Sequence, residues 1–389
     1  MKDKLRVLFL PRWYPNRNDP MPGLFIQRQA EALTPYCQVA VVYVHPEPDC
    51  PNKFEVDFAE EEEVRVLRVY YRIPTTRVSI LRNSLKLYRF YRAVFKAVKS
   101  IRQFSPDLIH AHILTRMGII AFFFSRRWKI PYIISEHWSR YFPENNTYKG
   151  FLRHRITCFI VRRASLVIVV SEALKEAMLK WKISNSEYRV IPNVVGSDLF
   201  IPNFNAGHRN KKQILHVSCF EDKSKNISGL LRVVKNLSLK RSDFECILAG
   251  EGPDFGKILE YSKELEIPSS LVHFPGLLTN HHLVDAYQSA DFMVLSSHYE
   301  TFGTVVVESM LCGTPVVATR VGIVPEIINA KNGVAVAPGN EDELGNAIEW
   351  MLDHCHTFNK EQIRRSVLNK FEKKNIGLAM VEAYHKIVL

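Results

Sequence analysis

The stretch that most constrains the fold lies in the second half of the chain. It reads DFMVLSSHYETFGTVVVESMLCGTPVVATRVGIVPEIIN, and clear signals mark where its strands and helix start and stop. It predicts a buried strand at Phe292–Leu295, a polar loop at Ser296–Gly303, a helix at about Thr304–Cys312 and a second buried strand at Pro315–Ala318. Gly313 supplies the residue after the helix, and Pro315 prevents the helix from continuing. A strand, a polar loop and a helix therefore follow one another directly.

Two glutamates stand eight positions apart in this stretch. Glu300 lies in the loop, where a carboxylate can meet a ligand. Glu308 lies about one turn into the helix among apolar neighbours, where an unpartnered carboxylate is costly to bury. Both could instead be solvated charges, since acidic side chains usually face water.

The residues between the glutamates predict an anion site. Phe302, Gly303 and Thr304 open the helix, so their free N–H groups and the positive end of the helix dipole could hold a phosphate. Gly303 would allow a ligand to approach the backbone closely.

Length and composition favour two large α/β domains. The 389 residues suffice for two or three domains of roughly 150 residues. An apolar fraction of 47% with 11% aromatic residues is enough for packed cores and argues against global disorder. The seven cysteines are scattered and show no CxxC spacing, which argues against a disulfide framework or a zinc site and favours a cytoplasmic setting.

The first half alternates continuous Val/Ile/Leu runs with helical patterns, which is typical of a parallel sheet covered on both faces. Ligands of such sheets gather at the carboxyl ends of the strands. The expected strands are Leu5–Leu10, Gln38–Val44, Val64–Tyr70, Leu108–Ala111, Tyr132–Ser135 and Leu166–Val170, and the expected helices include Phe25–Leu33 and Ser84–Phe104.

The net charge of +12 is unevenly distributed. No acid stands between Glu63 and Asp107, and Lys or Arg recurs every three or four residues from Arg82 to Arg102. This spacing predicts a basic stripe along one helix, opposite Leu85, Tyr88, Phe95 and Val98. The stripe could be an ordinary solvated face or could bind anionic lipid headgroups. Nucleic acid is disfavoured, because no recognition module accompanies the charge.

No metal site is expected. His110 and His112 point to the same side of a predicted strand, but no third ligand is evident, so core histidines are favoured. The chain has no D-x-D motif and no apolar run of the roughly 20 residues that cross a membrane. We also expect no secretory signal, because the first residues lack the pattern of one.

The segment HYETFGTVVVESMLCGTPVVAT resembles the E-x7-E signature of retaining nucleotide-sugar glycosyltransferases of family 4, which have the GT-B fold. The resemblance implies two Rossmann-like domains that face a central cleft. It implies an acceptor-side domain at residues 1–193, a hinge at 194–205, a nucleotide-sugar domain at 206–370 and a terminal helix at 371–389 that packs back on the first domain.

The resemblance also implies roles for particular residues. Glu300 would hold the transferred sugar, Glu308 the ribose, and the N–H groups of Phe302, Gly303 and Thr304 the diphosphate. Lys225 would offset charge on the leaving phosphate, and His137, after a buried strand, would orient the sugar. Three glycines match loops near the donor, at Gly23, Gly250 and Gly252.

One departure from the family pattern concerns the diphosphate. Cys219 occupies the position where the family has an arginine. Either Lys223 or another base compensates for the missing charge, or the helix start at Phe302 takes a larger share of the phosphate.

The resemblance implies a retaining, metal-independent hexosyltransferase that uses a nucleotide diphosphate-sugar as co-substrate and no cofactor. The acceptor would be a glycan or lipid-linked glycan in cell-surface polysaccharide synthesis, and the enzyme would be cytoplasmic or peripheral on the inner membrane face. Two alternatives stay open: a nucleotide-sugar epimerase or phosphorylase of the same fold, and a non-catalytic nucleotide-sugar-binding homologue.

Overall fold

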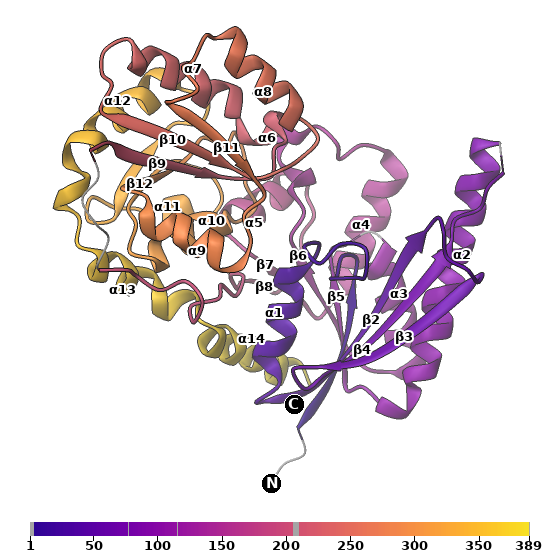
Figure 1. Ribbon diagram of the computed structural model, residues 1–389. Helices are drawn as coiled ribbons and strands as arrows, with labels where there is room; N and C mark the ends of the chain where they lie inside the picture. Colours follow the sequence, from indigo (N-terminus) through magenta and orange to yellow (C-terminus); the bar gives the residue numbers. More distant parts are fainter. Residues whose placement is uncertain (1–3, 77, 115, 205–209, 389) are drawn as a thin grey trace.

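The computed structural model describes residues 4–76, 78–114, 116–204 and 210–388, without the side chain of Arg102. The described residues form two sheets, one in each half of the chain (Figure 1). The fold is mixed α/β with helices on both faces of each sheet, as the alternating pattern predicts.

The N-terminal sheet has the strand order β3-β4-β2-β1-β5-β6-β7-β8. All neighbours in it are parallel except the β3–β4 pair, which is antiparallel. Its strands are β1 (Leu5–Pro11), β2 (Cys37–Glu47), β3 (Phe54–Glu61), β4 (Val64–Arg72), β5 (Leu108–His112), β6 (Tyr132–Glu136), β7 (Leu166–Val169) and β8 (Tyr188–Val190).

The helices of this domain separate by face. α1 (Leu24–Leu33) and the C-terminal α14 (Lys373–Val388) cover one face, whereas α2 (Ser79–Ser100), α3 (Arg116–Trp128) and α4 (Phe151–Arg163) lie on the other. α5 (Glu172–Lys180) follows β7 and is preceded by Ser171, whose Oγ accepts a hydrogen bond from the Leu174 N–H at 3.2 Å. Ser171 is therefore the N-cap of α5.

Helix α2 differs in two respects from its sequence prediction. It begins at Ser79 and ends at Ser100, where a short 3₁₀ turn replaces the last predicted residues. Its buried face is Phe90, Ala93, Val94, Ala97 and Val98. Tyr88 was expected on that face but is 55% exposed, because its ring lies beside Arg92 on the solvent side.

The C-terminal sheet is entirely parallel and has the order β11-β10-β9-β12-β13-β14. Its strands are β9 (Lys212–Val217), β10 (Phe244–Ala249), β11 (Val272–Gly276), β12 (Phe292–Leu295), β13 (Val316–Thr319) and β14 (Gly333–Val336). Its helices are α6 (Asp222–Lys225), α7 (Ile227–Ser238), α8 (Phe255–Glu264), α9 (Asn280–Ser289), α10 (Thr304–Leu311), α11 (Val324–Ile327), α12 (Glu341–His354) and α13 (Lys360–Phe371).

Alternate residues of the central strands divide the C-terminal core. Phe292 and Val294 pack with α7, α8 and α12, whereas Met293 and Leu295 pack with α10 and α13. Every side chain of β12 is buried, so the strand reads as one continuous apolar run. The strand, helix and second strand predicted from 291–329 are confirmed to within one or two residues.

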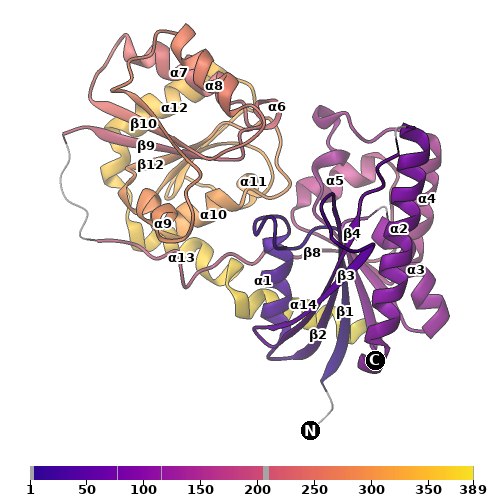
Figure 2. The same ribbon diagram turned by 45° about the vertical axis from the view of Figure 1, so that its right-hand side comes forward.

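Two connections join the domains (Figure 2). The chain leaves β8 through the segment around Val195, whose N–H bonds the Phe371 carbonyl at 3.1 Å. α14 then returns to the first domain, where Lys373 lies 3.5 Å from Glu31 of α1 and the Tyr384 hydroxyl bonds His110 at 2.8 Å. Residues 205–209, which include the end of the expected hinge, lie outside the described residues.

In the part of the chain that the structure describes, no helix combines the length and the hydropathy needed to cross a membrane.

Candidate active site

The loop after β12 brings Glu300 and Lys225 together. β9 and β12 are neighbours in the sheet, so the segments that leave their carboxyl ends meet. Lys225, at the end of α6, places its Nζ 2.5 Å from Glu300 Oε1, and the Ser297 hydroxyl donates to the same oxygen at 2.9 Å. The side chains of Lys225 and Glu300 are only 18% and 12% exposed, so this is a partly buried ion pair.

Two hydrogen bonds fix α6 against this loop. The Ser296 hydroxyl donates to the Lys225 carbonyl at 2.8 Å, and the His298 N–H donates to the Ser224 carbonyl at 2.8 Å. These hydrogen bonds hold the backbones of Lys225 and Glu300 near each other. The ion pair is therefore positioned by the surrounding backbone as well as by the attraction between the two charges.

The start of α10 combines a glycine in a left-handed conformation with backbone N–H donors. Gly303 has a left-handed backbone (φ 92°) and precedes Thr304, the first helical residue. Among the hydrogen bonds of the described residues, the N–H groups of Phe302, Gly303 and Thr304 have no acceptor. These donors lie close in the chain to Glu300, so an anion bound to them would lie near the ion pair.

A glycine that the sequence did not single out supports this turn. Gly322 (φ 54°) lies so close to the loop that an added Cβ would meet the Phe302 carbonyl oxygen at 2.4 Å and Glu300 Cβ at 3.0 Å. The next residue, Ile323, donates its N–H to that Phe302 carbonyl at 2.8 Å. The segment after β13 therefore holds the Glu300–Phe302 backbone in place.

Glu308 lies inside the protein, one turn along α10. It is 7% exposed, and the buried Tyr287 hydroxyl donates to Oε2 at 3.0 Å. Burial raises the pKa of Glu308, and the positive charge of Arg28 from α1 opposes that rise. The carboxylate thus has one protein donor on one oxygen, which leaves the other oxygen for a ligand hydroxyl.

Gly250 and Gly252 permit close packing of two loops. A Cβ on Gly250 would meet the Ser218 carbonyl oxygen at 1.8 Å, and one on Gly252 would meet the Phe220 backbone at 2.6 Å. These contacts position the segment that carries Cys219, which is exposed.

Lys223 donates to the Asn145 carbonyl of the other domain at 2.6 Å and so does not approach the ion pair.

In the N-terminal domain, Gly23 starts α1 with a left-handed backbone (φ 75°), and a Cβ there would meet the Trp13 carbonyl oxygen at 2.3 Å.

His137 follows β6 and is 6% exposed, with its ring 4.6 Å from that of Phe25 and 5.9 Å from that of His112. Burial lowers the pKa of His137 to about 3, so its imidazole is neutral near pH 7.

The backbone around His137 is held by a carboxylate that the sequence did not reveal. Glu136, 1% exposed, accepts hydrogen bonds from the N–H groups of His137 and Trp138 at 2.8 and 2.9 Å, from the Leu114 N–H at 3.1 Å and from the Tyr141 hydroxyl at 3.2 Å. Burial raises the pKa of Glu136, and the backbone donors oppose that rise.

The carboxyl edges of the two sheets meet at the Glu300 loop. The Ser171 hydroxyl donates to the Thr301 carbonyl at 2.6 Å, and the rings of Phe142 and Tyr299 stack at 6.3 Å. The structure thus places Lys225, Glu300, Phe302, Gly303 and Thr304 in one region at the domain interface. The ring contacts of His137 all come from the first domain.

His110 is a core residue, as favoured from the sequence. Its two ring nitrogens bond the Tyr384 hydroxyl at 2.8 Å and the Ser135 hydroxyl at 2.7 Å, so neither is available to a metal. His112 is fully buried, and burial lowers its pKa well below the usual value.

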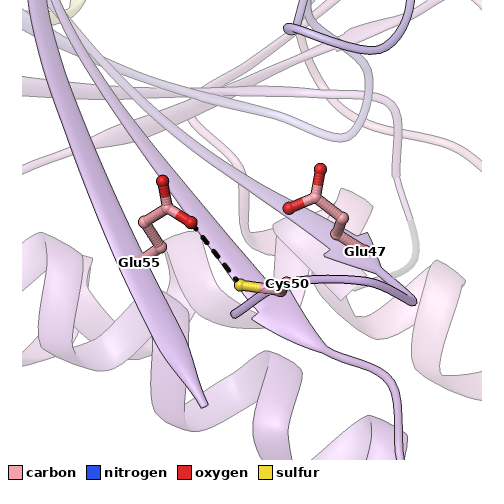
Figure 3. Close-up of side chains that lie close together, drawn as sticks. All are labelled: Glu47, Cys50 and Glu55. Carbon is pink, nitrogen blue, oxygen red and sulfur yellow. Dashed lines mark hydrogen bonds between the residues drawn. The ribbon is translucent and has the colours of Figure 1, made fainter. Parts of the chain in front are cut away.

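A different group of side chains is close enough to hold a metal: Glu47, Cys50 and Glu55, drawn in Figure 3. Arg17 already occupies the space between the two carboxylates, with Nε 3.0 Å from Glu47 Oε1 and Nη1 2.7 Å from Glu55 Oε1. Its hydrogen bonds lower the pKa of both carboxyls. The group therefore anchors the β1–α1 loop through Arg17, and we assign it no metal.

Four residues of this region had no signal strong enough to be singled out: Glu136, Tyr287, Ser297 and Gly322. Each acts through a contact between segments that are distant in the chain or separated by a turn. Only Glu136 offered a local hint, since an acid at the end of a buried strand is unusual.

Comparison with known proteins identifies the same two halves. The model for "Glycosyl transferase 4-like domain" matches residues 22–194, and the model for "Glycosyl transferases group 1" matches residues 200–365. A teichuronic acid biosynthesis glycosyltransferase of Bacillus subtilis is 24% identical over 371 residues, covering 88% of each chain. The alpha-monoglucosyldiacylglycerol synthase of Streptococcus pneumoniae is 27% identical over 67% of this chain and 63% of its own.

Solved structures share the fold over the whole chain. Sucrose-phosphate synthase from Thermosynechococcus elongatus superposes with a TM-score of 0.80 at 21% identity, covering 98% of this chain and 99% of the other. The Anabaena protein HepE, solved with UDP and glucose, gives a TM-score of 0.72 at 20% identity, covering 98% and 100%. With both halves matched and this architecture, the chain belongs to the family 4-like glycosyltransferases of the GT-B fold.

Proposed function

We propose that the protein is a retaining glycosyltransferase that moves a sugar from a nucleotide diphosphate-sugar to an acceptor hydroxyl. The observation that carries this proposal is the Lys225–Glu300 ion pair beside the N–H groups at the start of α10, which have no acceptor among the described residues. A cation, a carboxylate and several aligned donors in one partly buried region suit a ligand that joins a diphosphate to a sugar.

Each residue would then have a separate task. The α10 N–H groups and Lys225 would bind the diphosphate, Glu300 would accept hydrogen bonds from the sugar, and Glu308 would accept from the ribose. Lys225 would have to leave Glu300 for the phosphate as the donor enters. The ion pair is thus a resting arrangement that keeps both side chains aligned.

The chemical step we propose is attack from the face that the nucleotide leaves. The bond between the sugar C1 and the β-phosphate oxygen breaks, the acceptor oxygen bonds C1 on the same face, and the acceptor proton passes to the leaving phosphate. Lys225 and the helix dipole would stabilise the charge that develops on that phosphate, so no metal is required. His137, neutral near pH 7, would hydrogen-bond the sugar and would not carry a charge.

The relatives suggest probes. HepE is described with UDP and glucose, and the Bacillus subtilis relative is described in teichuronic acid biosynthesis. We therefore propose a UDP-sugar donor and an acceptor in surface polysaccharide or lipid-linked glycan synthesis. Closure of the two domains around a bound donor would exclude water from the reacting groups.

The experiment is a thermal-shift screen of nucleotide sugars, followed by a transfer assay with and without EDTA. A donor at about 100 times its dissociation constant should stabilise the protein by about 2.7 kcal/mol. Transfer that persists in EDTA and gives product with the donor's anomeric configuration supports the proposal. Conversion of the donor without any acceptor would instead indicate an epimerase, and donor binding without turnover would indicate a non-catalytic homologue.

We also propose that the enzyme works as a cytoplasmic protein at the inner membrane face. α2 exposes Arg92, Lys96 and Lys99, and its first turn exposes Ile80 at 78%. α4 begins with Phe151 and Leu152, exposed at 78% and 72%. Basic side chains with exposed apolar neighbours suit an anionic lipid surface.

Liposome binding tests this recruitment. Lys96→Glu with Lys99→Glu should weaken binding to anionic vesicles, since each base near the surface contributes about 1 kcal/mol. Lys331→Glu with Lys374→Glu makes the same charge change at exposed sites in the other half of the chain and should leave binding nearly unaltered. Equal binding of both double variants to anionic vesicles would contradict the proposal.

A further inference from the structure

Three arginines emerge from the carboxyl ends of three neighbouring strands in the N-terminal sheet. Arg12 follows β1 directly, Arg116 begins α3 after β5, and Arg140 lies in the short turn after β6. Because β1, β5 and β6 are adjacent in the sheet, their carboxyl ends lie side by side, and the Arg12 N–H bonds the His112 carbonyl at 3.1 Å.

Two of these guanidinium groups share one aromatic ring. Arg12 Cζ lies 5.8 Å and Arg116 Cζ lies 5.5 Å from the ring centre of Phe90, a buried residue of α2. Arg140, 7% exposed, stacks on Trp138 at 3.2 Å. The three cations are thus held in a largely apolar wall and are not spread over a solvated surface.

Within the described residues, neither Arg12 nor Arg116 has a hydrogen-bonded or ion-paired acid. Other arginines of this domain do have such partners: Arg6 pairs with Asp107 at 2.8 Å and Arg68 with Glu61 at 2.7 Å. The groups that face the cluster are the phenols of Tyr43, Tyr71, Tyr141 and Tyr148, the guanidinium of Arg153, and Glu136, whose oxygens already accept four hydrogen bonds.

The electrostatics of the cluster are correspondingly unfavourable without a ligand. Burial lowers the pKa of Arg12, and repulsion from Arg116 and Arg140 lowers it further. The first turn of α3 contains no acid, so Arg116 also sits at the positive end of a helix dipole. Arg12 and Arg116 are partly buried cations with no hydrogen-bonded or ion-paired acid among the described residues, which is costly, and a bound anion would relieve that cost.

We propose that Arg12, Arg116 and Arg140 form the binding site for an anionic group of the acceptor, a phosphate or a carboxylate near the hydroxyl that receives the sugar. This assignment to the acceptor rests on the proposed function. In that function the donor binds to Lys225 and α10 in the C-terminal domain, so the N-terminal sheet is left for the acceptor. Guanidinium groups suit both anions, since their planar donors can bind two oxygens at once.

The test measures anion binding while the nucleotide site is filled. Inorganic pyrophosphate, inorganic phosphate and glucuronate are titrated calorimetrically into the full chain at saturating UDP, for wild type, Arg12→Gln, Arg116→Gln and Arg127→Gln. Arg127 is an exposed arginine in the last turn of α3 and serves as the matched control.

We expect each cluster variant to weaken anion binding about tenfold or more, since a hydrogen bond to a charged group contributes roughly 1.5–3 kcal/mol. Arg127→Gln should bind as wild type, and UDP affinity should be unchanged in every variant. Stronger binding of pyrophosphate indicates a phosphate-bearing acceptor, and stronger binding of glucuronate a carboxylate-bearing one.

Two results would overturn the proposal. One is anion binding that Arg12→Gln and Arg116→Gln leave intact. The other is a parallel loss of UDP affinity, which would assign the cluster to the donor. If wild type itself does not bind UDP, the proposed function fails first and separately.

Thermal unfolding without ligand separates a ligand site from a structural one. An unpaired cation in this wall is destabilising, so Arg12→Gln should melt at the wild-type temperature or above it. A lower melting temperature would make the stacking on Phe90 structural. Arg12→Lys, which keeps the charge but not the planar donors, should retain part of the anion affinity.

Discussion

At the scale of single residues, Glu308 is the buried carboxylate to which we assign binding of the ribose. Tyr287 satisfies one oxygen, and burial raises the pKa of the group. A ribose hydroxyl on the other oxygen would replace solvent with a directed hydrogen bond. A positively charged ligand would bind Glu308 poorly, because the positive charge of Arg28 already interacts with the carboxylate and would repel such a ligand.

Glu308→Gln should therefore raise the KM for the donor about 10- to 100-fold, since a hydrogen bond to a charged acceptor contributes roughly 1.5–3 kcal/mol. The amide keeps the side-chain volume and can still accept from Tyr287. Steady-state kinetics over donor concentration check this, with kcat expected to change less than KM. A fall in kcat at unchanged KM would place Glu308 in the chemical step.

His137 gives a prediction about pH. Burial lowers its pKa to about 3, against about 6.5 in the unfolded chain, so the unfolded state takes up the proton first as the pH falls. The folded state should lose about 1 kcal/mol from this group between about pH 7 and about pH 5.5. Urea unfolding of wild type and His137→Phe at both pH values measures it.

The phenylalanine variant keeps the ring packing against Phe25 but has no proton to bind. Its stability relative to wild type should consequently improve by about that 1 kcal/mol at the lower pH. A stability difference that is the same at both pH values would show that His137 titrates normally in the folded protein.

At the scale of elements, the loop before α10 depends on a neighbour rather than on its own sequence. Gly322 brings the segment after β13 against Glu300 and Phe302, and Ile323 bonds the Phe302 carbonyl. At the other end of α10, the Arg364 guanidinium donates to the Leu311 carbonyl at 2.5 Å and to the Ser197 carbonyl at 3.0 Å. One arginine thus ties the helix end to the interdomain segment.

Gly322→Ala should lower the free energy of unfolding by about 1–3 kcal/mol and weaken donor binding, because a Cβ there meets the Phe302 carbonyl in a left-handed backbone. The matched control is Gly256→Ala in α8, where nothing lies within 4 Å of the added Cβ. That change should be neutral or stabilising by up to about 1 kcal/mol. Denaturant unfolding of the two variants gives the comparison, and equal effects would contradict the account.

The same scale shows what the sequence could and could not predict. Fully buried strands such as β12 and their following helices were predictable, because continuous apolar runs and the Gly313–Pro315 stop leave little choice. The antiparallel β3 was missed, since none of its residues is buried and half of them are acidic. Tyr88 was placed on the wrong face of α2 because helical spacing cannot reveal which apolar side chains a neighbouring sheet covers.

The candidate site divides in the same way. Glu300, Glu308 and the α10 start follow from a local motif. The closeness of Lys225 to Glu300 depends on the strand order β9–β12, which no local pattern encodes. Glu136, Tyr287 and Gly322 act only through such tertiary contacts.

At the scale of the whole molecule, two sheets present their carboxyl edges to each other, and contacts such as Ser171 to Thr301 cross between them. One edge carries the proposed donor residues, and the other carries His137 and the arginine cluster. α14 returns from the second domain to pack on α1 and His110, so two connections link the domains.

The central claim is that Lys225 binds the diphosphate and Glu300 binds the sugar. It is tested most directly by calorimetric titration of UDP and of the UDP-sugar that stabilises the protein in the thermal-shift screen. Lys225→Met should weaken both ligands about 10- to 100-fold, because it removes a charge-assisted contact to the diphosphate. Glu300→Gln should leave UDP affinity nearly unchanged while removing the additional affinity of the sugar and the transfer activity. Full transfer by Glu300→Gln, or UDP binding unaltered by Lys225→Met, would contradict the account.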